Sequence, residues 1–333
     1  MSEVSVGVVG ATGALGKEIV SVLQSAPWKP DTLVPLASDR TSVPFVPWGE
    51  GQIAVDGLST QALEEFDLLF LACPPDVAAD AGAGAADEGA WVVDLTGAFA
   101  DDPDVPLVVP WVNPERLAEP PPRGICALPL PEVMLLGPIL SALGRAGIAG
   151  EVEATIMLPA SLQGRDGMDE LSKQVVALFS SGTPPRKVFP DGLAFDLLPA
   201  VGEIGEDGWT SREVMVREQV RRMLGVQWPM HITLVGVPVF SGISAQISIR
   251  SGRQIPPDLA ERVLADAGVV FPDTAGARYL PRPRRVEGQP FVHVARTRSA
   301  DEGGSLHLWA GLDNLRGSAT AAVAVGGALL RHR

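Results

Sequence analysis

The sequence predicts an α/β protein built from a doubly wound parallel sheet followed by a second, mixed α+β domain. Three observations predict this fold. Strand-like and helix-like segments alternate up to residue 94, and a glycine-rich turn separates the first strand from the first helix. Near residue 131 the pattern changes to mixed segments. A chain of 333 residues is long enough for two domains with substantial cores.

The N-terminal part has the alternating order of a parallel sheet. Residues 4–9 are apolar and rich in β-branched side chains, which predicts the first strand, and residues 17–26 place apolar side chains at helical spacing. The elements predicted next are strands at 32–37, 66–72 and 90–94 and an Ala-rich helix over 77–90. Strands that alternate with helices in this way pair in parallel, which predicts the doubly wound sheet.

The second part of the chain has longer helices and an alternating strand. We predict helices over 133–146, 167–180 and 210–224 and strands over 151–157, 230–239 and 244–249. The last strand alternates polar and apolar residues, as a half-solvated antiparallel strand does. The C-terminal segment 312–333 is a helix of small residues that we expect to pack back on the first domain. The predicted domains are therefore 1–130 completed by 312–333, and 131–311.

Composition excludes several classes of protein. With 26 Lys and Arg against 40 Asp and Glu, the formal charge is −14, which argues against a nucleic-acid or anionic-membrane binder. No apolar run approaches a membrane span, and the N-terminus lacks the pattern of a secretory signal. Only Cys73 and Cys126 could pair, which fits a reducing cytoplasm. A mean hydropathy of +0.19 favours an oligomer.

The glycine-rich turn predicts a dinucleotide site in a Rossmann-type domain. Glycines at every third position, between a strand and a helix, let the backbone approach a pyrophosphate and direct free N–H groups toward it. An alternative interpretation is that these glycines only allow the helix to pack against the strand. The candidate cofactor-binding residues of the turn are Gly10, Thr12, Gly13, Ala14, Leu15 and Gly16.

The end of the second strand favours NADP over NAD. An NAD-binding domain usually places a carboxylate there to bind the ribose hydroxyls. Here Ser38, Arg40 and Thr41 lie at this position, and a guanidinium flanked by hydroxyls suits the 2′-phosphate of NADP. The alternative is that Arg40 is a solvated loop residue.

Five blocks of the chain resemble aspartate-semialdehyde dehydrogenases in their order and spacing. They are VGVVGATGALGKEIVSVL, WVVDLTGAFADDPDVPLVVPWVNPERL, LAFDLLPAVGEIGEDGWTSRE, GVPVFSGISA and LWAGLDNLRGSATAAV. The resemblance covers roughly residues 4 to 330. It implies a dinucleotide-binding domain completed by the C-terminal helix, and a central domain that carries substrate contacts and the homodimer interface. It also adds Asn314 to the cofactor-binding residues.

The same resemblance implies that the reacting groups of the family are missing. In that family a cysteine thiolate attacks the semialdehyde, the adduct loses hydride to NADP, and phosphate releases the acyl group. The cysteine position falls on Pro131, the active-site glutamine on Leu158, the substrate-binding arginine on Gly236 and the histidine on Ile243. The phosphate-binding arginine falls on Ala100, and a further basic residue falls near Met215.

The remaining reactive residue types do not replace those groups. We interpret Cys126 and Cys73 as buried or structural thiols rather than nucleophiles. The histidines, at positions 231, 293, 307 and 332, have no metal-ligand spacing to one another or to a cysteine, so no metal site is predicted. The basic run 281–285 is a solvated loop or a contact with an acidic partner.

The leading hypothesis is therefore a member of this family that keeps the fold, the homodimer and the NADP site but has lost the reaction. It would act as a binding or regulatory module, with an active paralogue as a further partner. One alternative is an active NADP-dependent oxidoreductase of amino-acid biosynthesis acting on a semialdehyde or acyl phosphate. Another is a structural partner with no ligand.

Overall fold

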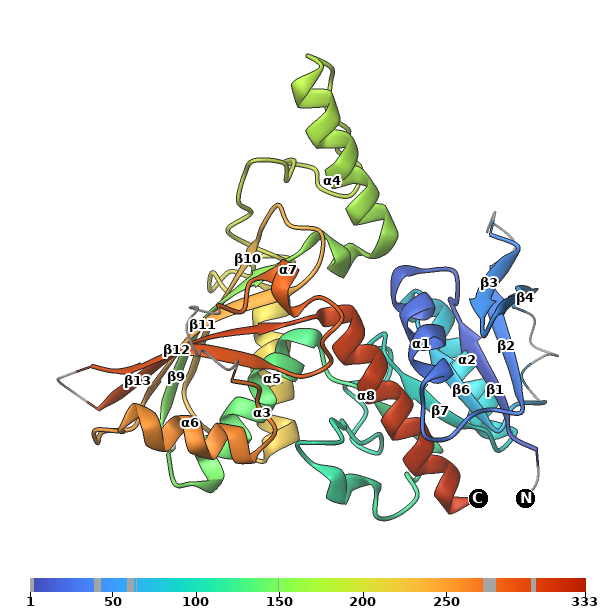
Figure 1. Cartoon of the computed structure of the whole chain (residues 1–333), viewed down its shortest axis with the longest axis horizontal. Helices are drawn as coiled ribbons and strands as arrows, with labels where there is room; N and C mark the ends of the chain where they lie inside the picture. The colour runs from blue at the N-terminus through green and yellow to red at the C-terminus, as the bar shows by residue number, and fades with distance from the viewer. Residues whose placement is uncertain are drawn as a thin grey trace. The chain divides into compact units, whose positions relative to one another are not determined.

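The computed structural model describes residues 3–38, 43–58, 63, 65–148, 150–271, 280–300 and 304–333 (Figure 1). It divides the chain into two compact units. The first unit joins Met1–Leu130 to Ser318–Arg333, and the second is Pro131–Gly317. Each unit has its own sheet, and each is described by itself below.

The sheet of the first unit is parallel throughout, as the sequence predicted. Its strand order is β5-β2-β1-β6-β7-β8. The strands are β1 (Ser5–Val9), β2 (Thr32–Ala37), β5 (Asp56–Gly57), β6 (Leu68–Leu71), β7 (Trp91–Asp94) and β8 (Ile125–Ala127). A separate hairpin of β3 (Phe45–Trp48) and β4 (Gly51–Ala54), which the sequence analysis did not predict, lies between β2 and β6 in the chain.

Two helices of this unit follow strands of the sheet. Helix α1 (Ala14–Gln24) buries Ile19, Val20 and Leu23, the residues at helical spacing in the sequence. Helix α2 (Pro75–Asp87) begins with a proline at its first position, where a missing N–H costs nothing. Short 3₁₀ turns lie at Pro114–Leu117 and Leu330–His332.

The C-terminal helix α8 (Asn314–Leu329) needs small residues because it packs very close to the first sheet. A Cβ atom on Gly326 would lie 2.7 Å from Leu68 and 2.8 Å from Phe70. Gly327 lies under Trp28, whose indole N–H donates to Val323 O at 3.2 Å. The expected packing of this helix on the first domain is therefore present, although its first turn belongs to the second unit.

The sheet of the second unit is mixed, with the order β10-β9-β11-β13-β12. Its strands are β9 (Glu151–Leu158), β10 (Met230–Gly236), β11 (Ile243–Arg250), β12 (His293–Ser299) and β13 (Ser305–Leu312). β9 and β10 are parallel, and the other neighbours are antiparallel. The alternating pattern predicted for β11 is confirmed, since its apolar residues are buried and Gln246 and Ser248 are half-buried.

Helices cover one face of this mixed sheet. α3 (Pro131–Arg145), α5 (Ser211–Leu224) and α6 (Pro257–Asp266) pack against β9–β13 on that face (Figure 1). The opposite face, termed the open sheet face, carries Thr155, Thr233, Gln246 and Trp309 in one cross-strand row. The 3₁₀ turn Ala160–Gln163 leads into α4 (Gly164–Phe179), which extends away from the sheet, and α7 (Pro283–Val286) contacts β13.

Among the described residues, no helix is long and apolar enough to cross a bilayer. α6 and the exact ends of several strands were not predicted. α6 is short, and its pattern offers only Ala260 and Leu264 as buried residues.

Candidate functional site

The glycine-rich turn joins β1 to α1, and two of its glycines are required by the backbone. Gly10 has φ +82°, and a Cβ there would lie 2.2 Å from Ala72 O. A Cβ on Gly16 would lie 2.1 Å from Gly10 O. The turn is further held by Gly10 N–H and Ala11 N–H, which both donate to Leu36 O of β2. These contacts make the tight turn and let the helix pack close to it.

Gly13 has a different environment from the other two glycines. It is the N-cap of α1, and a Cβ there would meet only Gly10 O, at 3.2 Å. No side chain caps α1, and its first turn has no acidic residue. The N–H groups of Ala14, Leu15 and Gly16 lie in the first turn of α1, where Gly13 has no side chain to cap them. A helix start of this kind suits a pyrophosphate.

Of the residues predicted to select NADP, the structure describes only Ser38. Ser38 directly follows β2 and is exposed. Arg40 and Thr41 lie outside the described residues. Pro74 and Pro75 start α2 close to the turn, since the preceding Ala72 O lies 2.2 Å and Cys73 N 3.1 Å from the place of a Cβ on Gly10.

Asn314 lies in the second unit and is engaged by the protein itself. Its side chain is buried, and Nδ2 donates to Ser161 Oγ at 3.0 Å while Oδ1 accepts from Gly242 N–H at 3.0 Å. The start of α8 is thereby tied to the turn before α4 and to the loop before β11. This anchoring explains why residues 314–317 belong to the second unit, whereas the sequence analysis placed them with the first.

Three positions that the resemblance assigns to substrate chemistry lie at one end of the mixed sheet. Leu158 ends β9, and Gly236, its register partner, ends β10. Ile243 begins β11 and pairs with Leu312 of β13. Leu158 is 3% exposed and Ile243 is 0% exposed, and both count among the core residues. These side chains therefore build the interior of the second unit.

The space beside Gly236 is occupied by Leu198. The two residues form an antiparallel bridge. Gly236 N–H donates to Leu198 O and Leu198 N–H donates to Gly236 O, with N to O distances of 2.8 and 2.9 Å. A Cβ on Gly236 would lie 3.1 Å from the Cβ of Leu198. A larger side chain at this position could enter only if Leu198 moved, and sequence reasoning did not identify Leu198.

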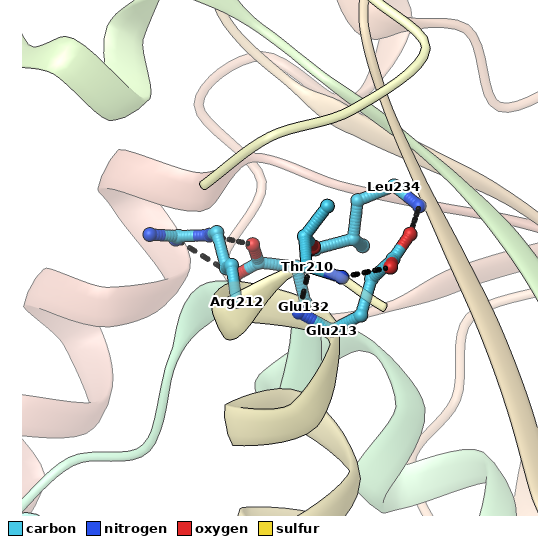
Figure 2. Close-up of polar contacts among 5 residues, drawn as sticks. All are labelled: Glu132, Thr210, Arg212, Glu213 and Leu234. Atoms are coloured by element: carbon cyan, nitrogen blue, oxygen red, sulfur yellow. Dashed lines mark hydrogen bonds and ion pairs between the residues drawn. The ribbon is translucent and has the colours of Figure 1, made fainter. Parts of the chain in front are cut away.

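Pro131, at the predicted cysteine position, is the first residue of α3. Next to it, Glu132 is 0% exposed and pairs with Arg212, whose Nε lies 2.5 Å and Nη2 3.2 Å from the two carboxylate oxygens (Figure 2). A carboxylate in the first turn of a helix is favoured by the helix dipole. The Arg212 guanidinium thus neutralises the buried Glu132 carboxylate at the start of α3. Sequence reasoning missed it because the partners lie 80 residues apart.

The start of α5 is closed by a complete capping box. Thr210 Oγ1 accepts from Glu213 N–H, and Glu213 Oε2 accepts from Thr210 N–H (Figure 2). The other oxygen of Glu213 accepts from Leu234 N–H of β10 at 3.0 Å. This cap fixes α5 against β10 and so places Arg212 beside Glu132. The Thr210-x-x-Glu213 spacing is a signal that a search for capping boxes would have found.

Both cysteines lie in surroundings that disfavour the thiolate. Cys126 lies in β8 and is 0% exposed, and burial raises the pKa of its thiol to about 12. Burial, then the nearby Asp94 carboxylate, raise the pKa of Cys73 to about 12. A reactive cysteine needs a lowered pKa and access to substrate, and neither thiol combines the two.

The other singled-out residues have structural surroundings. Ala100 is buried in the first unit, and Met215 is exposed on α5. His307 Nδ1 lies 2.7 Å from Ser248 Oγ, and burial lowers the pKa of His293. Within the described ranges, no group of three His, Cys, Asp or Glu residues could hold a metal ion. In the run 281–285, Pro281 O accepts from the Trp309 indole, and the arginines are exposed.

Two family models match the chain, one in each half. The model described as "Semialdehyde dehydrogenase, NAD binding domain" matches residues 5–119. The model described as "Semialdehyde dehydrogenase, dimerisation domain" matches residues 136–317. The first match contains the glycine-rich turn, and the second contains the end of the mixed sheet where Leu158, Gly236 and Ile243 lie.

Known proteins match the chain over nearly its full length. An aspartate-semialdehyde dehydrogenase of Aquifex aeolicus is 32% identical, and one of Rickettsia conorii is 29% identical, with 98% of each chain covered in both comparisons. The crystal structure of aspartate semialdehyde dehydrogenase II from Vibrio cholerae superposes with a TM-score of 0.92 at 26% identity, covering 99% of both chains. The similarity thus extends over both units.

Proposed function

Because the chain belongs to the aspartate-semialdehyde dehydrogenase family, we propose that it is a homodimeric, NADP-binding member that has lost the dehydrogenase reaction. The family reaction interconverts aspartyl phosphate and aspartate semialdehyde with NADP. This chain keeps the fold and the dinucleotide turn. Its proposed role is that of a binding or interaction module. The residues at the positions of the family's reaction centre support the loss of the reaction.

The single observation behind lost catalysis is the apolar character of the reaction centre. Pro131 has no nucleophile, and the buried Leu158 and Ile243 can transfer no proton. Gly236 has no cation, and Leu198 lies 3.1 Å from the place of its missing Cβ. With the thiol pKa of Cys126 raised to about 12 by burial, that cysteine does not supply the nucleophile either.

NADP binding is supported by the fit of the first unit. Gly10 and Gly16 shape the turn, and Gly13 leaves the start of α1 uncapped. Gly13, Ala14 and Leu15 would hold the pyrophosphate through backbone N–H groups, and Ser38 would face the adenosine ribose. Arg40 and Thr41 are proposed to bind the 2′-phosphate.

Homodimer formation is proposed to use residues 150–311 of the second unit. The match to a dimerisation domain supports this assignment. Helices cover one face of the mixed sheet, whereas the open sheet face carries half-buried residues such as Thr155, Gln246 and Trp309. Two-fold dimers are the commonest oligomers, and a dimer formed through this face would cover it. An active paralogue with the same open face is a further proposed partner.

The test is an assay of phosphate-dependent NADP reduction with aspartate semialdehyde, with an active relative as positive control. The expected result is no turnover. Binding is read separately from the shift in Tm that nucleotide produces, since a ligand that binds only the folded state raises Tm. NADP should raise Tm more than NAD does. Arg40→Ala should make the Tm shifts with NADP and NAD equal. Lys29→Ala, which removes a cation elsewhere in the first unit, should leave the larger shift with NADP unchanged.

The second candidate function is an active oxidoreductase, and the names of the full-length relatives favour it. Turnover near the usual range of about 1–1000 per second would establish it and refute the lost reaction. Loss of that turnover in Cys126→Ala would identify Cys126 as the nucleophile in place of the residue expected at position 131.

A further inference from the structure

A small charged cavity of the second unit lies between α4 and the segment that follows it, and we term it the α4 cavity. Its volume is about 250 Å³, which equals the space of about eight molecules of liquid water. From α4 it is lined by Asp166, Asp169, Glu170 and Lys173, and from the segment by Pro185, Lys187 and Val188. The four α4 residues lie three or four positions apart, so they share one face of the helix.

Two buried side chains of α4 hold the walls of the cavity together. The carboxylate of Glu170 accepts from the backbone N–H groups of Lys187, Val188 and Phe189 at 2.8–2.9 Å. Gln174 Nε2 donates to Pro185 O at 2.9 Å. Glu170 is 5% exposed and Gln174 is 0% exposed. The shape of the cavity is therefore fixed by the protein itself before any ligand binds.

Three charged side chains of the lining are not engaged by the protein. Within the part of the chain that the structure describes, the side chains of Asp166, Lys173 and Lys187 make no ion pair or hydrogen bond. All three residues are exposed, so a ligand can reach them from solvent. Asp169 differs from them, because its carboxylate lies 3.6 Å from Arg165 Nε.

The chemistry of a matching ligand follows from these charges. The cavity offers two ammonium groups and one carboxylate, and Pro185 and Val188 add apolar surface beside them. A ligand that satisfies all three charges has two anionic groups, one cationic group and a short carbon chain. A simple dianion would leave Asp166 without a partner, and a cation would leave both lysines without one.

We propose that the α4 cavity is a binding site for an acidic α-amino acid. The two carboxylates of the ligand pair with Lys173 and Lys187, its ammonium pairs with Asp166, and its carbon chain contacts Pro185 and Val188. This inference goes beyond the proposed function and does not depend on it. None of the lining residues belongs to the glycine-rich turn, to the reaction-centre positions or to the open sheet face.

The test is titration calorimetry of the full chain with L-glutamate and with L-aspartate. For ligands of about ten non-hydrogen atoms in an open cavity, we expect Kd near about 1 mM. Lys173→Gln and Lys187→Gln should each raise Kd at least about fivefold, because each removes one of the two cations. The matched control is Arg186→Gln, which removes the same charge from the same segment but does not change the lining, so Kd should stay the same.

A second ligand tests recognition of the ammonium group. Glutarate has both carboxylates of glutamate and no ammonium, so the wild-type chain should bind it more weakly than glutamate. Asp166→Asn should raise Kd for glutamate at least about fivefold and should not raise Kd for glutarate. Since Asp166, Lys173 and Lys187 are exposed, thermal unfolding without ligand should give the wild-type Tm for every variant.

Four results would overturn the site. The first is that neither amino acid binds at about 10 mM, well above the expected Kd. The second is binding that survives both lysine substitutions, which places the amino acid elsewhere on the chain. The third is an equal loss of affinity in Arg186→Gln and Lys187→Gln, which indicates only general attraction to positive charge. The fourth is equal affinity for glutamate and glutarate, which removes the role of Asp166.

Discussion

Removing either partner of the Glu132–Arg212 pair should destabilise the second unit, but by unequal amounts. The side chain of Glu132 is 0% exposed and that of Arg212 is 26% exposed. Arg212→Met leaves a fully buried carboxylate without its counter-charge, which costs about 3–5 kcal/mol. Glu132→Gln leaves a guanidinium that still reaches water and can bond to the amide, so we expect a loss of about 1–2 kcal/mol.

The double variant Glu132→Leu/Arg212→Met isolates the pair from the packing around it. Replacing both buried charges by apolar residues of similar volume is often neutral. We expect the double variant to lie within about 1 kcal/mol of the wild type. Together with the single variants Glu132→Leu and Arg212→Met it closes a double-mutant cycle, whose coupling energy should be about 2 kcal/mol or more. Arg165→Met is the matched control, because the Arg165–Asp169 pair is exposed at 3.6 Å and should contribute less than about 1 kcal/mol.

Urea titration read by hydrogen exchange of α3 and α5 peptides measures these energies in the second unit alone. The two units need not unfold together, so a global probe would mix their transitions. The reasoning is refuted if Glu132→Gln costs more than Arg212→Met. A cost below about 1 kcal/mol for Arg212→Met would refute it too.

Three further predictions concern the glycine-rich turn, the Glu170 carboxylate of α4 and the two thiols. Gly10→Ala places a Cβ 2.2 Å from Ala72 O at φ +82°, so it should lower the Tm of the first unit and abolish the NADP-dependent shift. Burial opposes ionisation of Glu170, but the N–H groups of residues 187–189 and the Gln174 amide outweigh it and lower its pKa. Its contribution to stability is thus complete above the ordinary value of 4.5 and is lost as pH falls through the lowered pKa, so the Tm deficit of Glu170→Gln should shrink below about pH 4. Burial raises the thiol pKa of Cys73 and Cys126 to about 12, so a disulfide reagent at pH 8 should react slowly with the folded chain and fully in urea; rapid reaction of the folded chain would contradict this.

Local patterns were sufficient to predict the elements that surround the dinucleotide turn. β1, the turn at Gly10–Gly16 and α1 carry their signals within twenty residues, since a buried strand, glycines and helical spacing are all local features. The small residues of α8 likewise predicted close packing, and Gly326 lies against the first sheet while Gly327 lies against Trp28. The β3–β4 hairpin was missed because its strands are short and partly exposed.

The candidate site was predictable only as a set of positions. Pro131, Leu158, Gly236 and Ile243 were identified by their place in recognisable blocks, and their roles stay predictions. Leu198 occupies the space beside Gly236 because it pairs with the end of β10, nearly forty residues later in the chain. No local pattern encodes such a pairing.

The sequence by itself determined the fold class, the succession of a parallel sheet and a mixed sheet along the chain, and the family, while the residues assigned to a reaction centre stay a prediction. Tertiary structure alone decided which charges meet and which apolar surfaces stay uncovered. Arg212 reaches Glu132 because the Thr210–Glu213 cap fixes α5 against β10. The segment before Phe195 lies along α4 because Glu170 and Gln174 accept from its backbone N–H groups, and the Phe195 side chain is 67% exposed. Both outcomes depend on contacts between residues far apart in the chain, which periodicity and spacing do not record.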